Sequence, residues 1–188
     1  MATPSNLKAI TLAGLIAVGL LVQAILSHAA GSETLTVAGG CFWCVEADFE
    51  KVKGVKGAVS GFAGGKKENP TYKQVTSGGT GHYEAVQITF DPAVVSADTL
   101  LDLFFRSVDP TDAGGQFCDR SDSYRIAIFA TDSQIAVAEQ AKAKAQSDLG
   151  KKIVTPVLGE TKFYPAEAYH QDYAKGSKMV ITPFGPKS

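Results

Sequence analysis

The sequence lacks a surplus of positive charge, and it lacks internal repeats. Its 188 residues carry 18 lysines and arginines against 19 aspartates and glutamates, a net charge of −1. A protein that binds nucleic acid through its charge needs a basic surface, so no DNA or RNA partner is indicated. The hydrophobic fraction is 45%, and no low-complexity tract follows the N-terminal region. The chain is therefore expected to form one domain with a sizeable core.

Cysteine is scarce. The chain contains Cys41, Cys44 and Cys118 only, so it lacks a second Cys-x-x-Cys pair. This excludes a zinc site built from four cysteines. A site of three cysteines with His82 or His170 stays open, although neither histidine has a partner at the spacing typical of zinc ligands.

The N-terminus resembles an export signal. Lys8 precedes an almost entirely apolar run, residues 9–26, and Ser27 to Ala29 are small residues at the positions that a signal peptidase reads. We expect residues 1–29 to be a signal peptide cleaved after Ala29, or else an uncleaved anchor in the inner membrane. The protein would then be exported to the periplasm, and its only membrane contact would be this segment.

An oxidising compartment lets disulfides persist. Three cysteines cannot all pair within one chain. One of them must stay free, pair between chains or alternate between partners. Alternation is typical of a catalytic thiol system.

The segment Gly40-Cys41-Phe42-Trp43-Cys44 carries the strongest signal. A strand pattern precedes it and a helical pattern follows it, so Cys41 is expected at a helix N-terminus, where the dipole and free N–H groups favour a thiolate. Phe42 and Trp43 suggest an apolar wall for a substrate. Cys44 lies about one helical turn from Cys41, close enough to consider a disulfide.

Periodicity predicts helices that gather on one face of a mixed sheet. The long loops near Gly64, Gly78 and Gly114 are expected to carry function. The expected strands are 34–38, 55–62, 84–90, 124–130 and 157–161; the expected helices are 45–50, 71–76, one capped by Ser96 that ends before Asp109, one capped by Thr131 or Asp132 that ends at Leu149, and a short one near 167–175.

Glu84 is the best candidate for an acid. The alternation of residues 84–90 places Glu84 on the same face as Val86, Ile88 and Phe90. Burial on that face raises the pKa of a carboxyl group. Tyr83 is its direct neighbour and must face the other side of the strand.

Several motifs together resemble one family. Gly40 to Cys44 followed by Glu46 is similar to the peptide methionine sulfoxide reductase A family, and the similarity extends over roughly residues 35–183. The implied fold is a ferredoxin-like two-layer α/β sandwich with long added loops, in one domain that spans residues 33–188. The other matching segments, in the family's order, are Asn69-Pro70-Thr71-Tyr72, Thr80 to Val86, Gln116 to Arg120 with Ser123-Tyr124-Arg125, and Tyr169 to Tyr173.

The resemblance implies reduction of methionine S-sulfoxide, free or in oxidised proteins. The reaction needs a nucleophile at sulfur, which Cys41 can supply, and a proton at oxygen, which Glu84 can supply. By resemblance, Tyr72 and Tyr124 donate hydrogen bonds to the sulfoxide oxygen and Asp119 orders the site. Phe42 and Trp43 would hold the substrate methyl group. His82 and His170 are expected to be structural hydrogen-bonding residues.

A second thiol must resolve the sulfenic acid that forms on Cys41. Many family members carry glycine at the position of Cys44 and use cysteines in the C-terminal tail, which has none here. Cys44 or Cys118 must therefore act, with Cys44 preferred for its proximity, and a relay through both stays open. The family implies a thioredoxin-like dithiol reductant, with no metal and no organic cofactor.

Two other functions stay open on the residues alone. A general thiol–disulfide oxidoreductase would also carry Cys41-x-x-Cys44 after a strand, with Thr155-Pro156 before another. The bulky Phe42-Trp43 pair and the position of Glu84 argue against it. An anchored periplasmic binding module would show no thiol loss when a sulfoxide is added.

Overall fold

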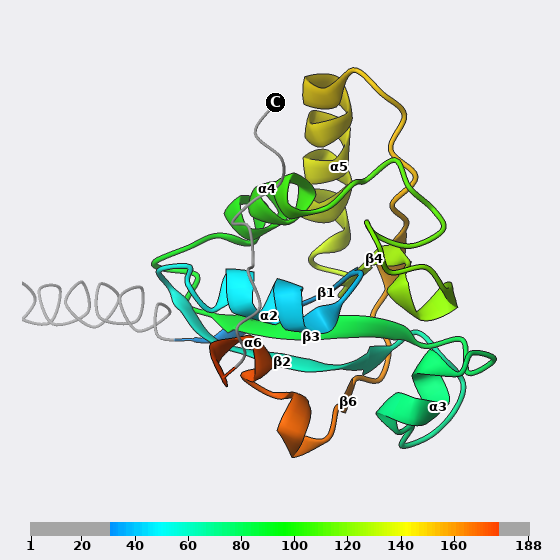
Figure 1. The fold of residues 1–188 in the computed structure, drawn as a ribbon. Helices are drawn as coiled ribbons and strands as arrows, with labels where there is room; N and C mark the ends of the chain where they lie inside the picture. The colour runs from blue at the N-terminus through cyan, green and yellow to red at the C-terminus, as the bar shows by residue number, and fades with distance from the viewer. Residues whose placement is uncertain (1–30, 177–188) are drawn as a thin grey trace, which may run out of the picture. The chain divides into compact units, whose positions relative to one another are not determined.

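The structure, a computed structural model, describes residues 31–176, which form one mixed α/β domain (Figure 1). Its sheet has six strands in the order β5-β4-β1-β3-β2-β6. The elements are β1 Glu33–Gly39, α2 Phe42–Phe49, β2 Val55–Ala63, α3 Tyr72–Thr76, β3 Tyr83–Phe90, α4 Ala97–Ser107, the 3-10 helix η1 Asp122–Tyr124, β4 Ile126–Ala130, α5 Ile135–Leu149, β5 Val157–Gly159, β6 Tyr164–Pro165, the 3-10 helix η2 Ala168–His170, and α6 Tyr173–Gly176.

The central strands have the ferredoxin-like arrangement. β1, β2, β3 and β4 are antiparallel to their neighbours in the order β4-β1-β3-β2, with α2 and α4 as the crossover helices. β5 adds in parallel beside β4, and β6 adds in antiparallel beside β2. The predicted ferredoxin-like sandwich with added segments is therefore confirmed.

The main core lies between the sheet and its helices. Figure 1 shows α2, α4 and α5 on one face of the sheet. Alternating strand residues point to this face and meet helical residues such as Leu101 and Phe104, which are fully buried. The strand residues of this core include Leu35, Val37, Phe62, Val86, Ile88, Phe90 and Ile128. A smaller apolar cluster around Phe129 covers part of the other face.

Local signals set most helix ends as expected. Ser96 caps α4 by accepting a hydrogen bond from the Thr99 N–H, and Thr71 and Gln74 form a capping box at α3. α5 ends at Gly150, which has a positive φ of 64°.

Several predicted boundaries were wrong, two of them for clear local reasons. α5 begins at Ile135 rather than after Thr131, because the Gln134 N–H donates to the Thr131 carbonyl and forms a turn first. β4 begins at Ile126 rather than Tyr124, because Ser121 caps the 3-10 helix that contains Tyr124.

The predicted signal segment, residues 1–29, lies outside the described residues. Within residues 31–176, the helices are too short or too polar to cross a membrane.

Candidate active site

Cys41 lies in the tight turn between β1 and α2, where it is the N-cap residue of α2. Gly40 before it has a φ of 82°, which favours glycine. A Cβ atom on Gly40 would also lie 2.6 Å from the Cβ of Gln116. The turn that presents Cys41 therefore requires glycine for both conformation and space.

Glu84 lies beside this turn because of the strand register. Val37 of β1 pairs with Val86 of β3, so Glu84, two residues away, lies next to the end of β1. Its side chain faces α2, and the residue is only 1% exposed. Glu84 Oε2 accepts a hydrogen bond from the Phe42 N–H at 3.1 Å, whereas Oε1 has no partner among the described residues.

Burial raises the pKa of Glu84 to about 8, and the hydrogen bond from the Phe42 N–H opposes this rise only in part. The negative charge of Asp119 raises the pKa further. At neutral pH the carboxyl group is therefore mostly protonated. A neutral acid with one free oxygen lies next to the thiol.

Tyr72 and Tyr124 complete this side of the site. Tyr72 begins α3, and Tyr124 ends the 3-10 helix before β4. The two phenols and Glu84 lie close enough to affect one another's pKa. Burial, followed by the charge of Glu84, raises the pKa of both phenols, so both hydroxyls stay protonated and can donate.

Cys41, the N-cap residue, and Cys44, within α2, share a hydrogen bond in this reduced state. That bond, together with burial, raises the pKa of Cys41, and the same bond lowers the pKa of Cys44. The backbone N–H groups of Cys44 and Trp43 lower the pKa of Cys41, as expected at a helix terminus, but the hydrogen bond with the Cys44 thiol and burial outweigh them in the resting protein.

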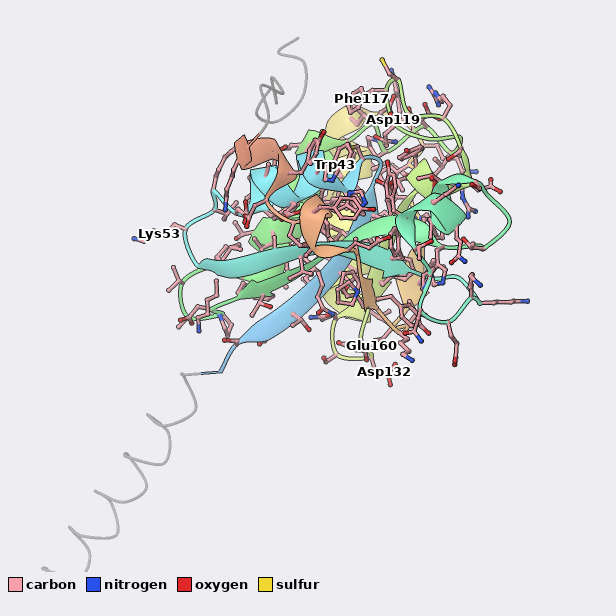
Figure 2. The ribbon with its side chains drawn as sticks, turned by 60° about the horizontal axis from the view of Figure 1, so that its bottom comes forward. Trp43, Lys53, Phe117, Asp119, Asp132 and Glu160 are labelled. Carbon is pink, nitrogen blue, oxygen red and sulfur yellow. The ribbon has the colours of Figure 1, made fainter. Side chains whose placement is uncertain are left out.

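Asp119 and Cys118 belong to a short turn packed against the Gly40 turn. Gln116, 1% exposed, anchors this turn through hydrogen bonds with the backbone of Asp109 at 2.7 and 3.0 Å. The negative charge of Asp119 acts on Cys44, Glu84 and both tyrosines, whereas Cys118 is exposed. Figure 2 shows Asp119 in the same half of the view as Trp43, away from Glu160 and Asp132.

An aromatic wall lines the other side of the site. Trp43 stacks on Tyr173 with ring centroids 4.0 Å apart, and Tyr72 lies 4.2 Å from His170. His170 is 3% exposed, and neither of its ring nitrogens has a hydrogen-bond partner among the described residues. Among the described residues, His170 contributes its ring faces and not the hydrogen bonds expected of it. Burial lowers its pKa and keeps it neutral.

Two other residues behave as predicted. His82 is structural, because Nδ1 accepts from the Gly65 N–H and Nε2 lies 2.8 Å from the Lys67 carbonyl. With both nitrogens engaged, it does not fit the alternative of three cysteines and one histidine around a metal. Tyr83 packs against Phe129 on the opposite face of the sheet from Glu84.

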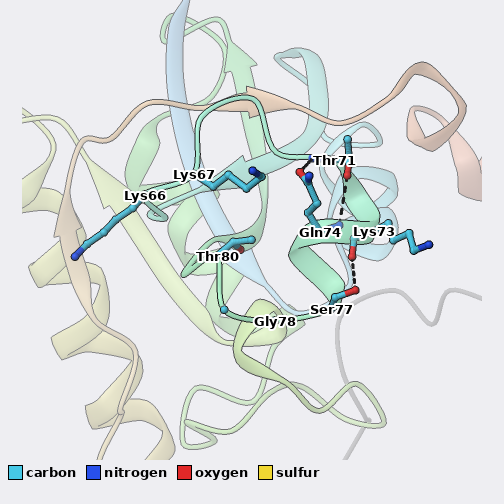
Figure 3. A pocket seen from close by; sticks show the side chains of 9 residues that line it. Lys66, Lys67, Thr71, Lys73, Gln74, Ser77, Gly78 and Thr80 are labelled. Carbon is cyan, nitrogen blue, oxygen red and sulfur yellow. Dashed lines mark hydrogen bonds between the residues drawn. The ribbon is translucent and has the colours of Figure 1, made fainter.

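A pocket of about 800 Å³ lies elsewhere (Figure 3). It is lined by the loop after β2, by α3 and by the loop that follows α3. Its lining includes Lys66, Lys67 and Lys73 but neither a cysteine nor a carboxylate. It lacks the groups that sulfoxide chemistry needs, so the candidate active site is the Cys41 cluster.

Reasoning from the sequence missed Gln116, Tyr173 and the aromatic role of His170. Each stands in a motif noted above, but their roles depend on chain segments that meet only after folding. The weak signal available was the aromatic content of residues 169–173.

Known proteins share both sequence and fold with this chain. A family model described as "Peptide methionine sulfoxide reductase" matches residues 33–183. "Peptide methionine sulfoxide reductase MsrA 2" of Rhizobium meliloti is 50% identical over 161 residues, covering 84% of this chain and 80% of that protein.

Solved structures agree with the sequence match. Reduced Mxr1 from Saccharomyces cerevisiae has a TM-score of 0.75 and 32% identity, covering 82% of this chain and 90% of that one. Mxr1 in complex with Trx2 has a TM-score of 0.53 and 27% identity, with 77% and 86% of the two chains covered. On these matches, the chain belongs to the peptide methionine sulfoxide reductase family.

Proposed function

We propose that Cys41 and Glu84 carry out the reduction of methionine sulfoxide that family membership assigns to this chain. The observation that carries the proposal is a buried carboxyl group with a pKa of about 8 and one unpartnered oxygen, beside a half-buried thiol. A carboxyl kept protonated at neutral pH can give its proton to a leaving oxygen.

The first step transfers oxygen from the substrate to Cys41. The Cys41 sulfur attacks the sulfoxide sulfur and loses its proton, for which Cys44 is the hydrogen-bonded acceptor. Glu84 protonates the sulfoxide oxygen, with Tyr72 and Tyr124 as further donors. Methionine leaves, and Cys41 becomes a sulfenic acid, so the substrate gains the two electrons that the thiol loses.

The aromatic wall selects the substrate. Phe42 and Trp43 would receive the methyl group, and contacts of sulfur with an aromatic ring are worth about 0.3–1.5 kcal/mol each. With the oxygen directed to Glu84 and the methyl group to this wall, one configuration at sulfur fits. We expect the S epimer to react and the R epimer to remain.

Cys44 is favoured as the first resolving thiol because it already hydrogen-bonds Cys41. Its attack on the sulfenic acid releases water and forms a disulfide. The exposed Cys118 can then exchange and carry the disulfide to the surface. A thioredoxin-like dithiol would reduce it, which the structure of the related Mxr1 in complex with Trx2 supports.

Turnover of a chiral methionine sulfoxide with dithiothreitol tests the function. We expect consumption of the S epimer alone, and equal loss of both epimers would contradict it. Mass spectrometry after one equivalent of sulfoxide, without reductant, maps the first disulfide. If Cys44→Ser forms a Cys41–Cys118 disulfide at the wild-type rate, Cys44 is not the first resolving thiol.

The N-terminal sequence pattern indicates the cellular compartment in which the protein acts. Lys8, the apolar run 9–26 and Ala29 support export to the periplasm and cleavage after Ala29. Cell fractionation should find a shortened chain in the periplasm. Full-length chain in membranes would indicate an uncleaved anchor, and full-length chain in the cytosol would contradict export.

A further inference from the structure

The C-terminal strap, residues 164–173, reaches the site from an edge of the sheet. Its first residues form β6, which pairs with β2 through Tyr164 and Phe62. Its last residue, Tyr173, stacks on Trp43 at 4.0 Å. The strap therefore connects the edge of the sheet to the aromatic wall.

Gln171 attaches the strap to β2 by imitating a strand neighbour. Its Oε1 accepts a hydrogen bond from the Ser60 N–H at 2.9 Å, and its Nε2 donates to the Ser60 carbonyl at 2.9 Å. The same nitrogen donates to the Ala166 carbonyl at 3.1 Å. The Ala166 N–H also donates to the Ser60 carbonyl at 2.9 Å, so Gln171 supplies the acceptor for the Ser60 N–H and a second donor at the carbonyl.

Glu46 attaches the strap to α2, the helix that begins at the catalytic turn. Glu46 Oε1 accepts the Asp172 N–H at 2.7 Å, and its other oxygen accepts the Ser60 hydroxyl. Asp172 has a φ of 54°, rare for a residue with a side chain, and this conformation redirects the chain toward Trp43. The Lys175 ammonium group lies 2.9 Å from the Glu50 carboxylate and 2.6 Å from the Asp172 carboxylate. Its positive charge offsets the negative charge of these two groups.

Along the strap, the residues that stack on Trp43 lie on both sides of the residues that bond the strap to β2 and α2. His170 and Tyr173 meet Trp43, at 5.5 and 4.0 Å between ring centroids. The two residues between them, Gln171 and Asp172, hold β2 and α2. The Trp43 Nε1 has no hydrogen-bond partner among residues 31–176. The indole is therefore held by its stacked neighbours, whose positions depend on the anchors.

We propose that Gln171 and Glu46 are positioning residues that fix the Trp43 indole through the C-terminal strap and so set the affinity for the sulfoxide. Neither side chain is required for the chemistry at Cys41. Their loss lets the strap, and with it His170 and Tyr173, move away from Trp43. Substrate binding then weakens while bound substrate still reacts. The proposal rests on the proposed function, in which Trp43 holds the methyl group.

Trp43 provides a direct readout because it is the only tryptophan in the chain. We expect Gln171→Met to shift Trp43 fluorescence to longer wavelength and to raise KM for the sulfoxide about tenfold, with single-turnover rates at saturating sulfoxide changed less than about threefold. Glu46→Leu should give the same shift from the other anchor. Glu46→Gln keeps an acceptor for the Asp172 N–H, so, unlike Glu46→Leu, it should have the wild-type fluorescence spectrum.

Gln134→Met is the matched control. Gln134 is also buried, and it donates to the Thr34 carbonyl, 100 residues away along the chain, at 2.7 Å, but it contacts none of the aromatic wall. It should leave the spectrum and KM unchanged. An unchanged spectrum in both Gln171→Met and Glu46→Leu would overturn the proposal, as would a KM change equal to that of the control. The fluorescence readout needs no turnover, so an inactive wild type would refute the proposed function alone.

Discussion

Replacing Glu84 with glutamine removes the acidic proton but keeps the size and the hydrogen-bond acceptor of the side chain. The amide oxygen can still accept the Phe42 N–H that Glu84 Oε2 accepts at 3.1 Å. The variant therefore keeps the contact between β3 and α2 but has no proton to give. General acid catalysis contributes about 10²–10⁴-fold to a rate, so single-turnover reduction should slow by that amount.

The same variant should change stability with pH in a defined direction. The pKa of Glu84 is raised from 4.5 to about 8 in the folded protein. Between these values the unfolded chain loses the proton and the folded chain keeps it, so the wild type loses stability as pH rises and levels off above about 8. Glutamine has no such dependence. At about 1.4 kcal/mol per pKa unit, the variant should gain about 3.5 kcal/mol relative to wild type between about pH 5 and pH 8.

Urea unfolding at several pH values, with stopped-flow single turnover on the same samples, measures both effects. Glu139→Gln, an exposed substitution on α5, is the control and should follow the wild type in both measurements. The activity of the wild type should fall as pH rises through about 8. Two results would refute Glu84 as the general acid. One is a difference in unfolding free energy between variant and wild type that does not change with pH over this range; the other is a variant that reacts at nearly the wild-type rate.

Other substitutions have equally specific outcomes. Cys41→Ser should abolish sulfoxide consumption, because Cys41 is the thiol that combines the start of α2 with the neighbouring acid Glu84; residual turnover with dithiothreitol would contradict this. Tyr124→Phe removes one donor to the oxygen and should lower the single-turnover rate by up to about 10²–10³-fold, with Tyr72 compensating in part; an unchanged rate would exclude the hydroxyl from the reaction. Gly40→Ala should destabilise the protein by more than about 1 kcal/mol in chemical denaturation, because its Cβ would meet Gln116 at 2.6 Å. Gly150→Ala, at a positive φ but with open space around it, should cost only about 1 kcal/mol, so a larger loss there than at Gly40 would contradict the steric argument.

The sequence predicted those parts of the site that depend on local pattern. Alternation in β3 placed Glu84 on the buried face, and the Gly39-Gly40 turn placed Cys41 at the start of α2, as the structure shows. It could not predict the pKa of Cys41, because that depends on the contact with the Cys44 thiol and on the degree of burial in the folded protein.

The contacts of the C-terminal strap could not be predicted from the sequence for a related reason. The hydrogen bonds of Gln171 join residues 111 positions apart along the chain. β6 has two residues, too few for a strand pattern to be recognised. Such pairings follow from the folded arrangement of the sheet edge and not from periodicity.

The sheet ends in short strands on both sides. Its two edges are β5, with three residues, and β6, with two. Beyond β6, the Gln171 side chain occupies the N–H of Ser60, and the Ser60 C=O accepts from both Ala166 and Gln171. Long open edges invite pairing with strands of other chains, and short or covered edges suppress aggregation. Short, covered edges therefore leave little open backbone with which a strand of an oxidised substrate protein could pair.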